Sequence, residues 1–456
     1  MKKTPMIPPL DPDFMPAVMF NSRYLASVKS TGKAIPVVIG LERENGLLAR
    51  FETVIRPETD HDTLRYVERL VKFMVWAYGG WKIFVGGPKP VGEYLKRCYA
   101  QGGTRAFDAD LMGRVYERSF DVVCTDAAKV PPAKSAASKT GGHLDGCRIG
   151  FDLGASDFKV AAVNEGVAVY SEEFPWNPKD QNDPAYHYSH LNTGLKKAAE
   201  HLPRVDAIGG SSAGVIVNNR IMVASLLRGI PPDKFKEASD IFLKIRKEWN
   251  VPLEVANDGD VTALAGAMSL GTNAMLGVAM GSSQAGGYLD PKGCMTGRLT
   301  ELAFVPVDYN PAAPADEWSG DNGVGALYFS QQAVSKLLPA AGIELPAGMG
   351  QPEKLKEVQS LMDKGDKRAT GIYETIGVYL GYAVPYYTDF YEFKNMLILG
   401  RVTTGPGGDI ILRTARKLLE RQFPETAANV MLHVPDEKSR RVGQAVAAAS
   451  LPAMKK

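Results

Sequence analysis

The sequence predicts an α/β protein with more than one domain, on three observations. A chain of 456 residues is too long for one ordinary hydrophobic core. From residue 148 onward, short apolar runs typical of strands alternate with segments of helical spacing, as in layered α/β folds. Three of the strand-like runs lead into glycine-rich or acidic turns, within residues 149–159, 255–267 and 398–409.

Composition and charge exclude several classes of protein. Hydrophobic residues make up 45% of the chain and charged residues 23%, as in ordinary soluble proteins, and the net charge is +2. This balance gives no reason to expect nucleic acid or a membrane surface as a partner. No run reaches the ~18–20 apolar residues of a membrane span, and we expect no signal peptide. The four cysteines lack metal-ligand and redox spacing, so we expect reduced thiols in a cytoplasmic protein.

A stretch rich in Ala, Lys, Pro, Ser and Gly, residues 126–146, predicts a linker after an N-terminal α/β domain of residues 1–125. Before the linker, the pattern predicts a hairpin with an Asn-Gly turn (37–55), then a helix (62–78), a strand (81–85) and a second helix (91–100). This order parallels that of residues 149–214. A degenerate half-copy of the later fold is therefore one hypothesis for residues 1–125, although they lack its acidic glycine turn.

The first turn, in residues 149–159, has the residues of a phosphate and metal site. Gly154 would let backbone N–H groups approach phosphate oxygens that a side chain would block. Ser156 can donate a hydroxyl, and Asp152 is placed to hold the water shell of Mg²⁺, which takes few carboxylates. A β-hairpin of this composition without a function is an equal alternative for this stretch alone.

The second turn predicts a catalytic base. Asn257 and Asp258 follow a strand and precede an alanine-rich helix. A carboxylate there can accept the proton of a hydroxyl that attacks a γ-phosphate, and Asn257 can bind neighbouring hydroxyls. The alternative is that an aspartate only caps the helix. We interpret Asp260 as the cap and Asp258 as the base, because Asp258 lies between two phosphate-type turns.

Two further turns complete the set. Gly281, Ser282 and Ser283 lie between strand-like runs and could form a second phosphate clamp, or only a polar hairpin. Residues 398–409 have small residues where a nucleotide would need close approach, with Gly400 just past a strand. A plain strand–loop–helix connection is an equal alternative for that segment alone.

Taken together, these motifs resemble those of the ROK family of sugar kinases, within the hexokinase/actin/Hsp70 superfamily. The likeness runs over residues 147–452, about two thirds of the chain. The motifs occur in the family's order. They are the first phosphate motif (149–159), the sugar-side loop (208–221), the catalytic segment (255–267), the second phosphate motif (277–287), the sugar-binding glutamate segment (297–304), the adenosine motif (398–415) and the closing helix (443–452).

The resemblance implies a two-lobed actin-like ATPase fold of ribonuclease H type, with lobes at 147–270 and 271–456. It implies a kinase that uses ATP and Mg²⁺, binds a small sugar-like substrate, and contacts neither nucleic acid nor membrane; we also expect a homodimer. The base would be Asp258 and the metal ligand Asp152. The implied acceptor residues are Ser212, Gly214, Asn257, Asp258 and Glu301. The implied nucleotide residues are Asp152, Gly154, Ser156, Lys159, Gly281, Ser282, Ser283, Gly400 and Gly405.

Some positions depart from the family's pattern. Phe304 stands where the family has a zinc-binding histidine, and residues 308–327 contain no cysteine, so we expect no zinc. Ser282 replaces the usual threonine of the second phosphate motif. Ala326 stands where a second sugar-binding glutamate would fall, which puts glucose-like recognition in doubt.

Two other functions remain open. Some ROK proteins are regulators with a DNA-binding N-terminal domain, and a ligand-binding regulator without turnover is one alternative. A kinase for a non-sugar acceptor on the same fold is the other. The retained Asp258 favours a kinase, and the pattern of residues 1–125 does not predict a winged helix-turn-helix.

Overall fold

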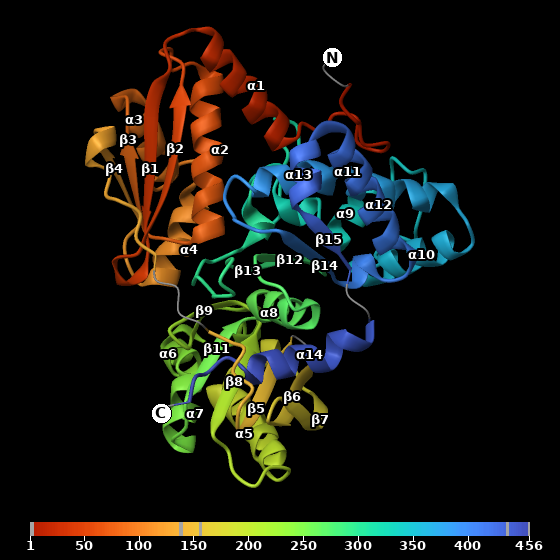
Figure 1. The fold of residues 1–456 in the computed structure, drawn as a ribbon. Coiled ribbons are helices and arrows are strands. Elements are labelled where there is room, and N and C mark those ends of the chain that lie inside the picture. Colours follow the sequence, from red (N-terminus) through yellow and green to blue (C-terminus); the bar gives the residue numbers. More distant parts are fainter. Residues whose placement is uncertain (1–3, 136–139, 155–156, 435–436, 455–456) are drawn as a thin grey trace. The chain divides into compact units, whose positions relative to one another are not determined.

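The computed structural model describes residues 4–135, 140–154, 157–434 and 437–454. The chain forms two compact units, and each combines stretches that are far apart in the sequence (Figure 1). Unit 1 consists of Met1–Ala136, Val278–Gly286 and Gly297–Val434. Unit 2 consists of Ala137–Gly277, Gly287–Thr296 and Pro435–Lys456. No helix among the described residues is long and apolar enough to cross a membrane.

Unit 1 begins with a four-stranded sheet in the order β2-β1-β3-β4 (red and orange in Figure 1). The elements are α1 Ala17–Ser30, β1 Ile35–Glu42, β2 Leu48–Ile55, α2 His61–Tyr78, β3 Lys82–Gly86, α3 Lys89–Tyr99, α4 Ala106–Tyr116 and β4 Asp121–Thr125. The predicted hairpin, α2, β3 and α3 are confirmed, whereas α1, α4 and β4 were not predicted. Asn45 and Gly46 have φ angles of 57° and 67°, the left-handed conformation that an Asn-Gly turn favours.

The strand directions separate this sheet from the sheet of unit 2. After the first hairpin and a helix, β3 pairs with β1 in the antiparallel direction. In unit 2 the corresponding strand, β8 (Ala207–Ser212), pairs with β5 (Cys147–Leu153) in the parallel direction. The two sheets share the same spatial order of their strands but differ in this strand direction, and the half-copy hypothesis stays a prediction.

Helix α2 packs against a later part of unit 1. Asp60 caps the helix by accepting a hydrogen bond from the Thr63 N–H at 2.9 Å. The Phe73 ring stacks on that of Phe390, with centroids 3.8 Å apart, and the Tyr78 hydroxyl donates to the Phe390 carbonyl at 2.8 Å. The apolar face of α2 is thus buried within the same chain.

A buried ion cluster joins α2 and the start of α4 to the segment that contains Asp321. The Asp321 carboxylate pairs with Arg69 at 2.8 Å, Lys72 at 3.2 Å and Arg105 at 2.8 Å. Burial alone would raise the pKa of Asp321, but these three cations hold it well below its usual range. Lys72 also pairs with Asp108 at 3.0 Å.

The rest of unit 1 is built around the sheet β13-β12-β14-β15. Its strands are β12 Met275–Met280, β13 Gln284–Leu289, β14 Asn395–Leu399 and β15 Met431–His433; β12 and β13 extend into unit 2. The helices are α9 Gln331–Leu337, α10 Gln351–Asp363, α11 Lys367–Tyr387, α12 Pro406–Gln422 and α13 Pro424–Asn429.

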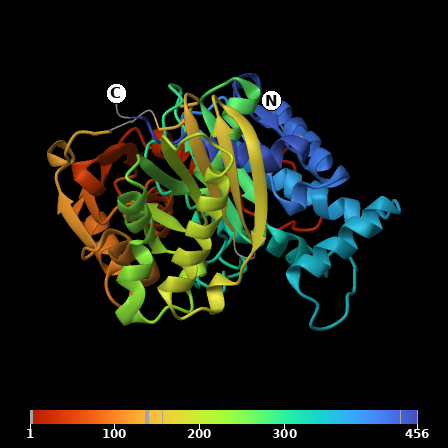
Figure 2. The same ribbon diagram turned by 90° about the horizontal axis from the view of Figure 1, so that it is seen from below.

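Unit 2 has a five-stranded sheet in the order β11-β8-β5-β6-β7. Besides β5 and β8, its elements are β6 Asp157–Asn164, β7 Val167–Pro175, α5 Pro184–Ala199, β9 Val215–Val217, β10 Arg220–Val223, α6 Phe235–Ser239, α7 Ile241–Trp249, β11 Leu253–Asn257, α8 Asp258–Leu270 and α14 Glu437–Ala449. Figure 2 shows α5 (yellow) and α7 (green) beside this sheet, where Leu195 and Ile245 join a core with Phe151.

Helix α14 lies very close to the sheet because two strands carry glycine beneath it. A Cβ on Gly209 would lie 1.8 Å from the Ala448 carbonyl oxygen, and one on Gly150 would lie 2.0 Å from that of Ala445. Neither position can hold a side chain, so the backbone of α14 rests directly on β5 and β8.

The ion cluster of unit 1 gives a stability prediction. Asp321→Asn would leave three buried cations short of one charge partner, so we expect the free energy of unfolding to fall by about 3–5 kcal/mol. Urea denaturation measures this. The control, Asp110→Asn, removes an exposed pair with Arg114 and should change stability by less than about 1 kcal/mol. Equal effects of the two variants would show that the cluster contributes little.

Candidate functional site

Three parallel strands of unit 2 end side by side and bring candidate residues to one edge of the sheet. β5 pairs with β8, and β8 pairs with β11. Asp152 lies opposite Ser211, and Asn257 lies opposite Ser212. Ligands of parallel α/β sheets bind at the carboxyl ends of the strands. Asp152, Asn257 and the Asp258 that follows it therefore lie at the edge where a ligand is expected.

Asp152 is held by two residues that the sequence did not single out. The Ser211 hydroxyl donates to Asp152 Oδ1 at 2.7 Å, and Gln444 Nε2 of α14 lies 3.4 Å from both Asp152 Oδ1 and Ser211 Oγ. Burial raises the pKa of Asp152, opposed by the Ser211 hydrogen bond and the charge of Lys159. Strand alternation was the available signal for Ser211, because neighbouring residues face opposite sides of a sheet.

Asp258 is the first residue of α8 and directly follows β11. Burial and the negative charge of Asp152 raise the pKa of Asp258 to about 6, although the Gly259 N–H donates to its carboxylate at 2.9 Å. Such a carboxylate is mostly ionised at neutral pH and is a stronger base than an ordinary aspartate. Its position and pKa suit a group that accepts a proton.

The cap of α8 is Asn257, whose Oδ1 accepts a hydrogen bond from the Gly259 N–H at 2.8 Å. The interpretation of Asp260 as the cap is wrong, because Asp260 lies inside the first turn of the helix. Its carboxylate instead accepts a hydrogen bond from the Tyr288 N–H at 3.0 Å. Burial, with a contribution from the charge of Asp258, raises the pKa of Asp260 to about 7.

The side chain of Asn257 also holds the predicted sugar-side loop. Its Nδ2 donates to the Gly214 carbonyl at 2.7 Å. Gly214 has a φ of 103°, and a Cβ there would lie 2.4 Å from the Val223 carbonyl oxygen, so only glycine fits. Ser212 is fully buried, and its hydroxyl donates to the Ala213 carbonyl at 3.3 Å. Asn257 and Gly214 thus contact each other, while Ser212 faces backbone.

The first phosphate turn is only partly described. The N–H of Gly154 donates to the Asp157 carbonyl at 3.0 Å, so this particular N–H is engaged in the protein. Ser156 lies outside the described residues. Lys159 lies on β6 opposite Asp152, with its Nζ 3.6 Å from Asp157 Oδ1 and 3.7 Å from Glu173 Oε2.

In unit 1, the second phosphate turn follows β12. The Gly281 N–H donates to the Ser283 carbonyl at 3.0 Å, and the side chains of Ser282 and Ser283 are exposed. A Cβ on Gly400, at the end of β14, would lie 2.4 Å from the Met280 carbonyl oxygen. Gly400 therefore lets the adenosine-type turn lie directly beside the second phosphate turn.

Gly405 is the residue before α12 and has a φ of 67°, a conformation that glycine adopts without strain. It places the N-terminus of this 17-residue helix next to the turn that begins at Gly400. Backbone N–H groups at such a helix start favour anions.

Glu301 also lies in unit 1, within residues 297–304, which we call the acceptor loop. Its N–H donates to the Trp76 carbonyl at 3.0 Å. Gln284, with its amide oriented to donate, lies 3.0 Å from the Leu302 carbonyl oxygen. Ala326 is buried in the short turn Gly325–Leu327. Trp76 could not be predicted from the sequence, because its contact with the loop joins segments far apart in the chain.

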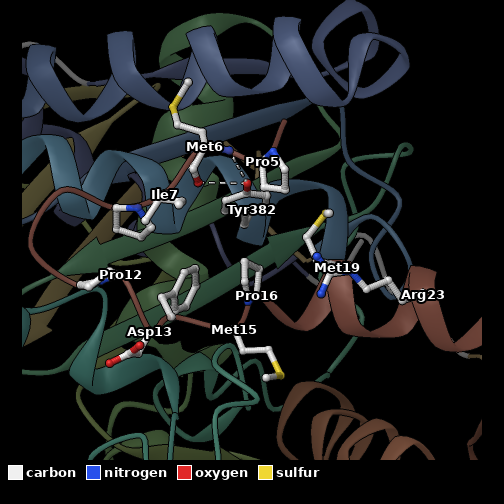
Figure 3. Close-up of a pocket in the computed structure, with 12 residues that line it drawn as sticks. Pro5, Met6, Ile7, Pro12, Asp13, Met15, Pro16, Met19, Arg23 and Tyr382 are labelled. Carbon is white, nitrogen blue, oxygen red and sulfur yellow. Dashed lines mark hydrogen bonds between the residues drawn. The ribbon is translucent and has the colours of Figure 1, made fainter. Parts of the chain in front are cut away.

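Two further features are separate from these residues. Within the described ranges, no group of three or more His, Cys, Asp or Glu side chains is arranged to hold a metal ion. A pocket lies between the N-terminal segment and α11, where the Met6 N–H donates to the Tyr382 hydroxyl at 3.0 Å (Figure 3). None of the predicted site residues lines this pocket.

Solved structures share the fold of this chain. A ROK hexokinase from Thermus thermophilus is 17% identical with a TM-score of 0.52, over 66% of this chain and 97% of that chain. A ROK family glucokinase from Streptomyces griseus, solved with glucose and AMPPNP, is 17% identical with a TM-score of 0.51, over 67% and 99%. A ROK family transcriptional regulator, a homolog of the E. coli MLC protein, is 18% identical with a TM-score of 0.53, over 68% and 79%.

The expected α/β, actin-like fold of ROK proteins is therefore confirmed over about two thirds of the chain, while the additional N-terminal domain stays a prediction. Neither a protein-family model nor a curated protein sequence matches the chain. Since sugar kinases and a transcriptional regulator share this fold at 17–18% identity, the fold leaves the activity open.

The pKa of Asp260 predicts how the stability of the protein depends on pH. Because the folded chain binds this proton more tightly than the unfolded chain, the free energy of unfolding should rise as the pH falls from 8 to 5. Asp260→Asn should reduce the slope of this pH dependence, to which the raised pKa of Asp258 contributes with the same sign. Urea denaturation midpoints between pH 5 and 8 measure the slope. Asp240→Asn, which removes the carboxylate paired with Arg220, should keep the slope; an unchanged slope in Asp260→Asn would contradict the assignment.

Proposed function

We propose that this chain, which has the ROK fold, is an ATP-dependent carbohydrate kinase. It would transfer the γ-phosphate of ATP to a hydroxyl of a sugar or sugar derivative. The observation that carries the proposal is the carboxylate of Asp258, which follows β11 and has its pKa raised to about 6 beside Asp152. A protein that only binds a ligand does not need a base with these properties.

In the proposed reaction, Asp258 accepts the proton of the acceptor hydroxyl as that oxygen bonds to the γ-phosphorus. The bond from the γ-phosphorus to the bridging oxygen breaks, and ADP leaves with that electron pair. Asn257 links the base to the sugar-side loop, since it caps α8 with one amide atom and holds Gly214 with the other. The base and this loop are thereby kept in one arrangement, which favours a productive orientation of the acceptor.

The residues present fit a magnesium ion. Mg²⁺ keeps most of its water and takes one or two carboxylates, and Asp152 is one carboxylate fixed by Ser211 and Gln444. When bound, the ion would neutralise charge on the β- and γ-phosphates. In unit 1, Gly281, Ser282 and Ser283 would bind phosphate oxygens, and Gly400 and Gly405 the nucleoside end.

The second candidate function is a sugar-binding regulator without turnover. The observation that favours it is the ROK transcriptional regulator, with a TM-score of 0.53 to this chain. A kinase for a non-sugar acceptor is also compatible with the residues of unit 2. ADP release measured across sugars, amino sugars and polyols separates the three: the kinase releases ADP with one of them. The regulator binds without release, and the non-sugar kinase responds to none. The expected homodimer and cytoplasmic location stay predictions.

Asp258→Asn should lower turnover by roughly 10²–10⁴-fold, because the amide cannot accept the hydroxyl proton. Nucleotide binding, measured by calorimetry, should be largely kept. Asp240→Asn removes a carboxylate elsewhere in unit 2 and should keep turnover. Near-normal turnover in Asp258→Asn would remove Asp258 from the role of base.

Asp152→Asn should raise the Mg²⁺ concentration needed for half-maximal ADP release by about 10–100-fold, the usual effect of losing a group that holds metal-bound water. A Mg²⁺ titration at saturating ATP measures this. Elemental analysis of the purified protein should find no tightly held zinc. An unchanged Mg²⁺ requirement in the variant would place the metal elsewhere.

A further inference from the structure

We infer that Trp76, near the end of α2, is a positioning residue for the acceptor loop and therefore for Glu301. The inference rests on the proposed function, in which Glu301 binds the acceptor. It gives the N-terminal part of unit 1 a role in recognising the acceptor.

The backbone of the acceptor loop completes the hydrogen bonds of α2. Three consecutive N–H groups of the loop donate to three consecutive carbonyls of the helix: Leu299 to Tyr78 at 3.2 Å, Thr300 to Ala77 at 3.0 Å and Glu301 to Trp76 at 3.0 Å. The last carbonyls of a helix have no partner within the helix, and buried ones require a partner elsewhere. The loop therefore supplies the partners, and the helix end fixes the position of the loop backbone.

The side chain of Trp76 contacts the same loop beyond Glu301. Trp76 is almost fully buried, and its ring centroid lies 4.2 Å from that of Phe304. The Phe304 N–H in turn donates to the Glu301 carbonyl at 3.3 Å. Trp76 thus holds the loop at Glu301 through its carbonyl and three residues later through its ring.

The indole itself is held in one place. Its Nε1–H donates to Asp108 Oδ1 at 3.0 Å, and Asp108 pairs with Lys72 at 3.0 Å. Lys72 is fully buried and also pairs with Asp321 at 3.2 Å. The buried ion cluster therefore orients the ring on which Phe304 packs.

The other side of the loop is tied to the residue after the second phosphate turn. Gln284 is buried, and its amide nitrogen, oriented to donate, lies 3.0 Å from the Leu302 carbonyl oxygen and 3.2 Å from that of Gly325. The turn has its own support, because the Gln331 N–H donates to the Gly281 carbonyl at 2.9 Å. Loss of the Trp76 ring should therefore displace Glu301 more than it displaces the second phosphate turn. Even a small displacement of a group that positions the substrate lowers the catalytic rate or the substrate affinity strongly.

The test compares Trp76→Leu and Trp76→Phe with a matched control. Trp76→Leu removes the ring that packs on Phe304 and should raise the acceptor KM by about 10-fold or more, with the KM for ATP nearly unchanged. Trp76→Phe keeps an aromatic ring there and should recover most of the acceptor affinity. The control is Tyr66→Leu, which removes a buried ring of the same helix that stacks on Tyr24, with centroids 4.5 Å apart.

Three kinetic outcomes decide the inference. An acceptor KM that rises in Trp76→Leu, recovers in Trp76→Phe and stays normal in Tyr66→Leu supports it. An unchanged acceptor KM in Trp76→Leu overturns it, as does an equal rise in Tyr66→Leu. If Trp76→Leu does not fold, Phe304→Leu removes the same ring contact from the side of the loop and replaces it in the comparison.

Amide hydrogen exchange separates this inference from the proposed function. If no tested acceptor is phosphorylated by the natural protein, the proposed function fails, but exchange still reports on the loop. Faster exchange at residues 299–301 in Trp76→Leu, and not in Tyr66→Leu, shows that Trp76 anchors the loop. Unchanged protection there in both variants overturns the anchoring role.

Discussion

The contact of α14 with the sheet of unit 2 is the constraint on which the proposed catalytic edge depends. Gly150 and Gly209 admit the helix backbone to a distance that a side chain on either would forbid. This approach brings Gln444 within reach of Asp152 and Ser211. The parallel pairing of β5, β8 and β11 places the carboxylates at one edge, and the helix then adds the residue that helps to hold the first of them.

The buried carboxylates at the strand edge of unit 2 and Asp321 of unit 1 have pKa values shifted in opposite directions. In unit 2, burial raises the pKa of Asp152, Asp258 and Asp260, and the negative charge of one neighbour adds to the shift of each of the last two. In unit 1, Asp321 is surrounded by cations and its pKa is lowered. A buried carboxylate without a cation beside it costs stability, and for Asp258 this cost agrees with the proposed role of accepting a proton. Burial alone raises the pKa of Asp389 in unit 1 to about 6, so the raised pKa of Asp258 supports this role only together with its position after β11.

Local sequence patterns predicted much of the fold but less of the candidate site. The Asn-Gly hairpin, α2 and the strand before Asp258 follow from rules that act over a few residues, so they could be predicted. The direction of β3 could not, because pairing with β1 is decided by tertiary contacts. The cap of α8 was assigned to Asp260 in error, since Asn257, three residues earlier, is an equally good capping residue. Gln444 and Trp76 act through partners distant in sequence, which a single sequence does not reveal.

The contacts of α2 bear on the choice between a kinase and a regulator. In a regulator whose N-terminal domain only carries a DNA-binding surface, few contacts with the ligand side of the fold are needed. Here the N-terminal part shares a buried ion cluster, a stack between Phe73 and Phe390, and three backbone hydrogen bonds with the rest of unit 1. Removing it would leave Asp321 without its cations and the acceptor loop without the helix end that holds it. An N-terminal part bound in this way is better suited to shaping the proposed acceptor site than to moving independently, and this favours the proposed kinase over a regulator.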